Sequence, residues 1–513
     1  METLLAGPGE KLADSLKVLK SLQAENRRVF QSKEFGRVHR ERLLRNGFLR
    51  EVMKGWVISA SPGTGDGDST TWFASFWEFC ARYCHERFGE DWHLSPEQSL
   101  LLHAGNTVIP TQIIFYSPKG KNNTVHLLFN TSLYDLKQKN MSPRSDIIEM
   151  DGLRIYTVPV ALTKVSESFY QGYPVEAQVV LSRISDGSDL LRPLLAGGHS
   201  AIAGRLVGAL RRMGKNAVAD DVASGMKAAE YTIRETDPFE ANQQFVTIIP
   251  SASPIVARLQ AMWETHRGVV IEKFPVAPGL PKNQKGYLQA VDEIYKSDAY
   301  HSLSIEGYRV TPELIDRVRS GAWNPDQNNA DQKNRDALAA RGYWQAFQLV
   351  KEDVTAVIGG QTAADLVRRT HRNWYRELFQ PCVTAGLIGT EVLAGYRNDA
   401  VYLRTSRYVP PRWEAVRDAM PTLFDLFSQE KEPSVRAVLG HWFFGYIHPY
   451  PDGNGRMARF LMNVMLASGG YPWTVIRVED RNAYLAALEA ASVDANIEPF
   501  AQFIAERVGV QPK

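Results

Sequence analysis

The sequence HPYPDGNGRMAR, residues 448–459, decides the fold of the C-terminal half of this chain. Before it, residues 435–447 carry apolar side chains at helical spacing, which predicts a buried helix. The two prolines of the stretch end that helix, because proline lacks an amide donor and disfavours helical backbone before it. A second apolar helix is predicted from Arg456 to the glycine pair at 469–470. The expected local structure is therefore a helix, a tight turn and a second helix.

The turn from Asp452 to Gly455 leads directly into a helix N-terminus. The first amides of a helix point outward without a helical partner, and the helix dipole adds partial positive charge. Phosphate groups bind at such a place. Gly453 and Gly455 permit positive φ and leave room for the close approach of a ligand. The turn therefore predicts a phosphate-binding site.

The side chains of the stretch suit the same ligand. Asp452 offers the hard oxygen that Mg²⁺ prefers, and Asn454 can donate to a phosphate oxygen. Arg456 and Arg459 share a helix face and can hold different phosphates with forked donors. His448, with an ordinary pKa of about 6.5, suits a general base at neutral pH. One histidine or one Gly-x-Gly is weak evidence, so the prediction depends on the whole set.

The stretch resembles the signature of the Fic family, His-Pro-Phe-x-(Asp/Glu)-Gly-Asn-Gly-Arg-x-x-Arg. It departs from the signature at Tyr450, where phenylalanine is usual and where a buried hydroxyl requires a partner. The resemblance implies transfer of AMP from ATP to a Ser, Thr or Tyr hydroxyl of a target protein, with release of pyrophosphate. Such a transfer depends mostly on positioning and charge neutralisation.

The resemblance also implies a role for each position of the signature. His448 is the expected catalytic base, and Asp452 is the expected ligand of the Mg²⁺ cofactor. The residues expected to hold the phosphates of ATP are Gly453, Asn454, Gly455, Arg456 and Arg459. Tyr484, before a predicted helix at 485–492, borders the nucleoside end of the site in this family, where its ring would pack on adenine. The alternative is that Tyr484 is an ordinary core residue.

Two upstream segments resemble regulatory and docking parts of the family. Residues 401–404 are β-prone and resemble the flap, a β-hairpin that pins the target by strand addition. The expected docking residues are Val401, Tyr402, Leu403 and Arg404, and an ordinary surface hairpin is the alternative. The segment from Ser302 to Gly307 resembles the inhibitory pattern (Ser/Thr)-x-x-x-Glu-(Gly/Asn).

In that pattern Glu306 pairs with Arg459 and places negative charge where the γ-phosphate belongs. Ser302 and Glu306 lie one helical turn apart, as the pattern requires. The alternative is a helix-end glutamate before a C-capping glycine. In some family members the same glutamate helps to remove AMP from the target, so that direction of the reaction stays open.

The N-terminal segment is more basic than the rest. Residues 11–55 carry twelve Lys/Arg and five Asp/Glu, whereas the whole chain has 59 basic and 57 acidic residues and a net charge of +2. Predicted helices at 12–22 and 36–45 and β-prone stretches at 48–52 and 55–58 follow the order of a winged helix. The second helix predicts DNA contacts from Arg37, Arg40, Arg42 and Arg45. A protein-docking module or a solvated basic face is the alternative.

The middle of the chain is predicted to be mixed α/β. The expected strands are 112–116, 125–129 and 153–158, and the expected helices are 95–103, 201–212 and 217–228. Together with the winged helix, this region resembles the antitoxins of type IV abortive-infection systems, which bind their own promoters.

At 513 residues the chain is too long for one ordinary domain. We expect a multidomain protein, with a mostly α-helical Fic core and β-hairpin flap preceded by a winged-helix domain and a mixed α/β region. The expected parts are 1–62 for the winged-helix-like domain, 63–240 for the middle domain, 241–274 for a proline-rich linker, and 275–513 for the Fic domain with its inhibitory helix near 298–307.

Three cysteines, no apolar run of about eighteen residues and no signal-peptide core predict a cytoplasmic protein that does not enter a membrane. The leading hypothesis is an autoinhibited protein adenylyltransferase. Its expected partners are ATP, an unknown target protein, DNA through the N-terminal domain, and a second copy in a homodimer. The alternatives are a DNA-binding regulator or antitoxin-like protein with a nucleotide-responsive Fic domain, and a Fic enzyme that uses another nucleotide or removes AMP.

Overall fold

The computed structural model describes residues 8–63, 67–239, 253–321 and 335–508. These residues fall into two compact units. Unit 1 comprises Met1–Ala241 and Tyr402–Val409, and unit 2 comprises Asn242–Val401 and Pro410–Lys513. Among the described residues, no helix is long and apolar enough to cross a membrane.

Unit 1 begins with two helices on a three-stranded antiparallel sheet. The helices are α1 (Pro8–Leu22) and α2 (Arg37–Arg45), and the strands, in sheet order, are β1 (Val29–Gln31), β3 (Trp56–Ser59) and β2 (Leu49–Met53). Successive strand residues point to opposite faces. Phe30 and Val57 join a core with α1 and α2, and Val29 and Ile58 join a second core on the other face.

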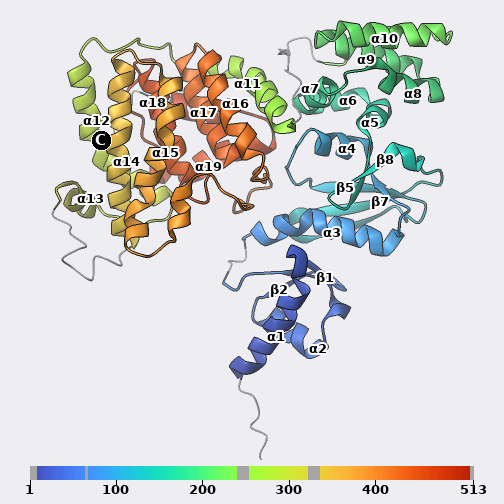
Figure 1. Ribbon diagram of the computed structural model, residues 1–513, viewed down its shortest axis with the longest axis horizontal. Coiled ribbons are helices and arrows are strands. Elements are labelled where there is room, and N and C mark those ends of the chain that lie inside the picture. The colour runs from blue at the N-terminus through green and yellow to red at the C-terminus, as the bar shows by residue number, and fades with distance from the viewer. Residues whose placement is uncertain (1–7, 64–66, 240–252, 322–334, 509–513) are drawn as a thin grey trace, which may run out of the picture. The chain divides into compact units, whose positions relative to one another are not determined.

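The second core is built on α3 (Thr70–Phe88), which runs along the sheet that contains β5 and β7 (Figure 1). That sheet has the order β4 (His93–Leu94), β5 (Gln112–Ser117), β7 (Ser132–Lys137) and β6 (Asn123–His126), with β5 and β7 parallel. A hairpin of β8 (Ile147–Met150) and β9 (Leu153–Tyr156) contributes to the same core. The boundary predicted after residue 62 therefore falls inside one compact unit.

Helices complete unit 1. They are α4 (Pro96–His103), α5 (Val158–Lys164), α6 (Glu167–Gly172), α7 (Pro174–Ser182), α8 (Gly187–Gly197), α9 (Ser200–Arg212) and α10 (Asn216–Ala228). Three of them, α4, α9 and α10, lie at the predicted positions. The strand predicted over 125–129 is wrong in its second half. It ends at His126, because Phe129 has φ 50° inside a short 3₁₀ turn.

The regular elements of unit 2 are all helices in the part of the chain that the structure describes. Its helices are α11 (Pro254–Lys273), α12 (Gln284–Ile305), α13 (Pro312–Arg319), α14 (Arg335–Ile358), α15 (Ala363–Thr384), α16 (Val416–Gln429), α17 (Pro433–Ile447), α18 (Asn454–Ala467), α19 (Arg481–Val493) and α20 (Glu498–Ala505). The paired helices α17 and α18 form its centre and are buried on nearly every side. Helices α11 and α16 pack on α17, and α12, α14 and α15 pack on α18 (Figure 1).

Two predictions for unit 2 need correction. The expected linker at 241–274 contains α11, because Pro254 occupies the first turn of a helix, where its missing amide costs nothing; residues 240–252 lie outside the described residues. The expected β-hairpin flap is also wrong, since residues 401–410 form no strand. Within this segment the Arg407 carbonyl accepts from the Ile109 amide at 2.8 Å and the Val409 carbonyl accepts from the Thr107 hydroxyl, and these isolated bonds form no strand ladder.

Candidate active site

His448 follows directly on α17 and adopts the left-handed conformation, with φ 51°. Its Nδ1 lies 3.2 Å from the carbonyl oxygen of Gly445, and because a carbonyl can only accept, Nδ1 carries the proton. Nε2 is therefore the unprotonated ring nitrogen, as a general base requires. Burial lowers the pKa of His448 to about 4, and the charge of Arg397 acts in the same direction. The imidazole is neutral at neutral pH.

Asn454 starts α18, but its side chain faces back into the loop. Its side-chain oxygen accepts from the Tyr450 amide at 2.9 Å, and its Nδ2 donates to the Tyr450 carbonyl at 2.8 Å. Only 2% of the residue is exposed. The side chain expected to donate to a phosphate thus closes the turn, and the groups left at this end of α18 that could donate to a phosphate are the backbone amides of its first turn.

The two glycines of the turn lie where a side chain would collide. Gly453 has φ 80°, and a Cβ there would lie 2.8 Å from the ring of Phe379. A Cβ on Gly455 would lie 2.3 Å from Oε1 of Glu306. The carboxylate of Glu306 therefore rests directly against the N-terminus of α18, at the position where a phosphate would bind.

Arg456 and Arg459 are only 1% and 3% exposed. Three of their nitrogens, Nε and Nη2 of Arg456 and Nη1 of Arg459, make no hydrogen bond within the described residues. The rings of Tyr308 and Phe379 flank the Arg456 guanidinium, with centroids 5.2 and 5.0 Å away. Buried donors without acceptors are costly. The pair is therefore suited to an anion with several oxygens.

Ser302 and Glu306 contact Arg459 from the end of α12. Oε1 of Glu306 lies 2.7 Å from Arg459 Nη2, and Ser302 Oγ accepts from Arg459 Nε at 2.8 Å. Burial opposes the ionisation of Glu306, but the charges of Arg459 and Arg456 outweigh it and lower its pKa. The predicted pair between Glu306 and Arg459 is present, and the side chain of Glu306 remains 30% exposed, at the mouth of the site.

Asp452 lies at the rim of the loop with 62% of its side chain exposed. Its Oδ1 accepts from the Gly453 amide at 2.7 Å, and its Oδ2 lies 3.5 Å from Arg456 Nη2. Within the described ranges of the chain, no group of three or more metal-ligating side chains occurs. A single carboxylate beside phosphate-binding amides fits Mg²⁺, which takes one or two carboxylates and completes its shell with phosphate oxygens and water.

The Tyr450 ring fills the position of the usual phenylalanine. It is fully buried and stacks on Tyr375, with ring centroids 3.7 Å apart. Its hydroxyl has no hydrogen-bond partner among the described residues, although a buried hydroxyl was expected to find one. A buried hydroxyl without a partner generally costs about 1–3 kcal/mol.

Tyr484 is a core residue of α19. It is 3% exposed, its hydroxyl lies 2.7 Å from Nε2 of His441, and its ring packs near Phe500 and Phe503. This is the alternative that the sequence left open, and it leaves no free ring face for adenine in this arrangement.

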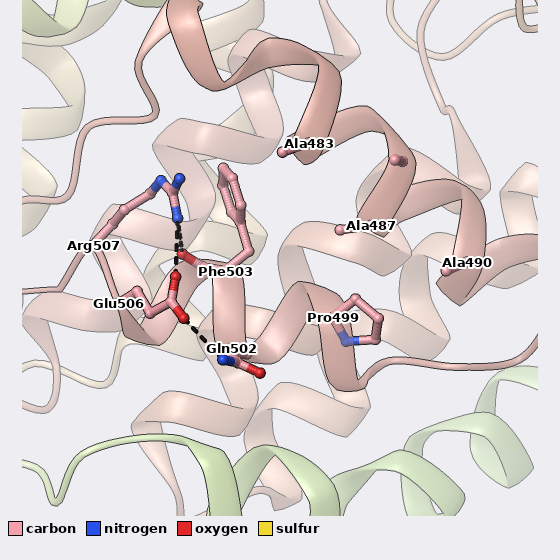
Figure 2. Close-up of a pocket in the computed structure, with 9 residues that line it drawn as sticks. Ala483, Ala487, Ala490, Pro499, Gln502, Phe503, Glu506 and Arg507 are labelled. Atoms are coloured by element: carbon pink, nitrogen blue, oxygen red, sulfur yellow. Dashed lines mark hydrogen bonds and ion pairs between the residues drawn. The ribbon is translucent and has the colours of Figure 1, made fainter.

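A separate pocket of about 410 Å³ lies between α19 and α20. Figure 2 shows its lining, which includes three labelled alanines of α19 and Pro499, Phe503 and Arg507. No residue of the loop at 448–459 lines it. The pocket is therefore distinct from the candidate active site.

The expected docking residues of the flap already have partners in this chain. The Tyr402 hydroxyl accepts from Arg28 at 3.1 Å, and Arg404 pairs with Asp68 at 3.1 Å. These four residues belong to unit 1, whereas Val401 belongs to unit 2. Val401 and Leu403, which complete the expected set, are half-buried.

The four arginines expected to contact DNA differ in their surroundings. Arg40 donates to the Ser32 carbonyl, and Arg42 donates to the Lys11 carbonyl and to Ser15 Oγ. The two that are exposed on the same helix are Arg37, which pairs with Glu41, and Arg45.

One buried acid near the site, Asp298, was not predicted from the sequence. Asp298 lies one turn before Ser302 on α12 and accepts from the Tyr343 hydroxyl at 2.6 Å. Burial raises the pKa of Asp298 to about 6. An acid four residues before Ser302 on the same helix face was the available signal.

Residues 362–466, which contain α15 to α18, match the sequence model of the Fic/DOC family. Together with the loop geometry, this match defines the segment as a Fic/DOC domain.

The curated relatives are named as protein adenylyltransferases. Protein adenylyltransferase Fic from Nematostella vectensis is 29% identical over 230 residues, which cover 44% of this chain and 50% of that protein. Protein adenylyltransferase fic-1 from Caenorhabditis elegans is 32% identical over 114 residues, 21% of this chain and 22% of that protein. The chain therefore spans about half the length, or less, of these relatives. A solved structure of Fic-1 from C. elegans aligns with 65% of this chain and 94% of its own, at 18% identity and a TM-score of 0.36.

Proposed function

We propose that this protein transfers AMP from ATP to a Ser, Thr or Tyr hydroxyl of a target protein, and that Glu306 holds it inactive. One observation carries the proposal. A neutral His448 stands at the entrance to a helix N-terminus whose two arginines keep buried nitrogens without hydrogen-bond partners. The names of the relatives from N. vectensis and C. elegans support the same activity.

The N-terminus of α18 supplies the phosphate site. Its first amides and the dipole of the helix would hold the α-phosphate. Arg456 and Arg459 would bind the β- and γ-phosphates through the nitrogens that now lack acceptors. Asp452 would hold Mg²⁺, which neutralises phosphate charge when bound.

His448 would act on the second substrate. As the target hydroxyl oxygen forms its bond to the α-phosphorus, Nε2 of His448 takes the hydroxyl proton, the bond from the α-phosphorus to the bridging oxygen breaks, and pyrophosphate leaves. The other ring proton would stay on Nδ1. Its hydrogen bond to the Gly445 carbonyl would keep the orientation of the ring during the reaction.

Glu306 would block this reaction by occupying the phosphate site. Its carboxylate lies next to Gly455 and pairs with Arg459. ATP would therefore have to displace this carboxylate or bind with its γ-phosphate elsewhere. Like charges placed together in such a site cost several kcal/mol.

The reaction type and the nucleotide can be tested together. The Glu306→Gly protein is incubated with a cell lysate and with ATP, CTP, GTP or UTP labelled at the α-phosphate. We expect label in protein from α-labelled ATP and none from γ-labelled ATP, because only the AMP part is transferred. Label from another nucleotide would replace AMP in the proposal, and label from the γ-position would contradict it.

A second candidate function is DNA binding by unit 1, favoured by the exposure of Arg37 and Arg45 on one helix. The double variant Arg37→Glu, Arg45→Glu should bind DNA from the gene's own promoter about 10-fold more weakly or worse, and the slope of log affinity against log salt should fall by about two. Arg192→Glu, an exposed charge reversal elsewhere in unit 1, is the matched control. Equal band shifts by all three proteins would exclude the role of α2.

A further inference from the structure

Arg397 joins three parts of unit 2 through one guanidinium. Its Nε donates to the His448 carbonyl at 2.7 Å, its Nη1 donates to the Asp399 carbonyl at 2.9 Å, and its Nη2 donates to the carbonyls of Pro411 and Ile447. Its own backbone amide donates to Pro449 at 2.9 Å. The residue is only 2% exposed. A buried cation with this many backbone acceptors fixes the relative positions of those acceptors.

The contacts with Ile447 and His448 lie at the C-terminus of α17. The last carbonyls of a helix have no helical donors, and a cation there is stabilised by the helix dipole. His448 also has φ 51°, a conformation that a non-glycine residue keeps only where its surroundings hold it. Arg397 donates a hydrogen bond to the His448 carbonyl, and the Gly445 carbonyl accepts one from the His448 ring, so both the backbone and the ring of His448 are fixed.

The contacts with Asp399 and Pro411 lie at the two ends of the segment that includes 402–409. The Arg397 guanidinium therefore donates to the Asp399 and Pro411 carbonyls as well as to the His448 carbonyl. Arg417 also supports one end, through bonds to the Arg397 carbonyl and the Trp413 carbonyl, each at 2.7 Å. The bonds of Arg417 reach neither α17 nor His448.

We propose that Arg397 is a positioning residue that orients His448 for proton transfer and ties this orientation to the backbone at Asp399 and Pro411. The proposal rests on the base role of His448 in the proposed function. The hydrogen bonds described for Arg397 all go to backbone carbonyls and not to the phosphate-binding arginines or to the ring of His448. Loss of Arg397 should therefore lower kcat and leave the KM for ATP almost unchanged, since a displacement of about 1 Å at a catalytic group can cost about 100-fold.

The pKa of His448 gives a second measurement. It should change when the charge of Arg397 is removed, whereas a purely structural role of Arg397 would leave it unchanged. Among the described residues, the charge of Arg397 lowers the pKa of His448, and the charges of Glu306 and Asp452 raise it. Removing the charge of Arg397 should raise the pKa of His448, and replacing Arg397 by lysine should leave that pKa near its starting value. The acid limb of the rate profile should then move to higher pH for Arg397→Gln alone.

The test uses the full chain with Glu306→Gly as the parent protein. Arg397→Lys should lower kcat about 10- to 100-fold with the KM for ATP within about 2-fold. Arg417→Lys, which loosens the same segment without touching α17, should keep kcat within about 3-fold. Equal losses in the Arg397 and Arg417 variants, or an unchanged kcat in Arg397→Lys, would overturn the proposal.

The histidine resonances supply a measurement that needs no activity. The His448 signal is assigned by its absence from the His448→Ala protein and is titrated in the parent, Arg397→Gln and Arg397→Lys proteins. A raised pKa in Arg397→Gln alone is expected, and equal values in all three would contradict the electrostatic part. If Arg397→Gln melts far below the parent, the kcat comparison of Arg397→Lys with Arg417→Lys decides. A parent without transfer activity would refute the proposed function, and the titration would still test Arg397.

Discussion

The Glu306→Gly protein is expected to transfer AMP at least about 100-fold faster than the unchanged protein. The reason is local: Oε1 of Glu306 lies 2.7 Å from Arg459 Nη2 and presses against the N-terminus of α18. A γ-phosphate at this place would meet a carboxylate, which costs several kcal/mol, and about 1.4 kcal/mol corresponds to a tenfold change. The measurement is the initial rate of self-labelling and target labelling with α-labelled ATP.

Two further substitutions separate charge from space. Glu306→Gln keeps the size of the side chain and removes its charge, so its transfer rate should lie between those of the unchanged and Glu306→Gly proteins. Ser302→Ala removes the hydroxyl that accepts from Arg459 Nε and should weaken the hold on Glu306 less than either change at 306. Equal rates in the unchanged and Glu306→Gly proteins would show that this contact does not restrain the reaction.

Stability provides an independent check of the same contact. Removal of Glu306 leaves the buried guanidinium of Arg459 without its carboxylate, and breaking such a pair is destabilising. Glu306→Gly should therefore melt at a lower temperature than the unchanged protein. ATP should restore more stability to the variant than to the unchanged protein, because a ligand stabilises the state that binds it. Equal thermal shifts with ATP would contradict competition between Glu306 and the nucleotide.

The helices around the active-site loop were predictable because their signals are local. Prolines at 449 and 451 follow the end of α17 at Ile447, and Gly453 caps α18, which begins at Asn454, two residues before the predicted start at Arg456. The pair of Ser302 with Glu306 came from the family resemblance, with which its helical spacing agrees. Its partner, Arg459, came from the same resemblance, and the structure brings the three side chains together.

The predictions that were wrong or incomplete depended on distant contacts. The segment after Val401 has β-prone residues, but its Arg407 and Val409 carbonyls bond to Ile109 and Thr107, about 300 residues away in the chain, which no local pattern reveals. Asn454 was expected to face a phosphate, yet its amide group is matched to the backbone of Tyr450 across the turn. A donor in a motif, such as Asn454, therefore predicts that a hydrogen bond forms, but it does not predict the acceptor.

His448→Ala is expected to reduce transfer by about 100- to 10,000-fold, the usual contribution of a general base. The change is best made in the Glu306→Gly background, where the phosphate site is free. His199→Ala, which removes an exposed histidine of unit 1, is the matched control and should keep the full rate. Binding of ATP should survive in the His448→Ala protein, because the phosphate donors belong to α18 and its arginines.

The pH dependence distinguishes a buried base from an ordinary histidine. Burial lowers the pKa of His448, and loss of the Glu306 charge, which raises it, should lower it further in the parent variant. A group with a lowered pKa stays unprotonated until the pH falls through that pKa. The rate of the Glu306→Gly protein should therefore stay level from about pH 8 to about pH 6 and decline only in more acidic buffer. A fall in rate centred at about pH 6.5, as for an exposed histidine, or full activity after His448→Ala, would assign the proton to another group.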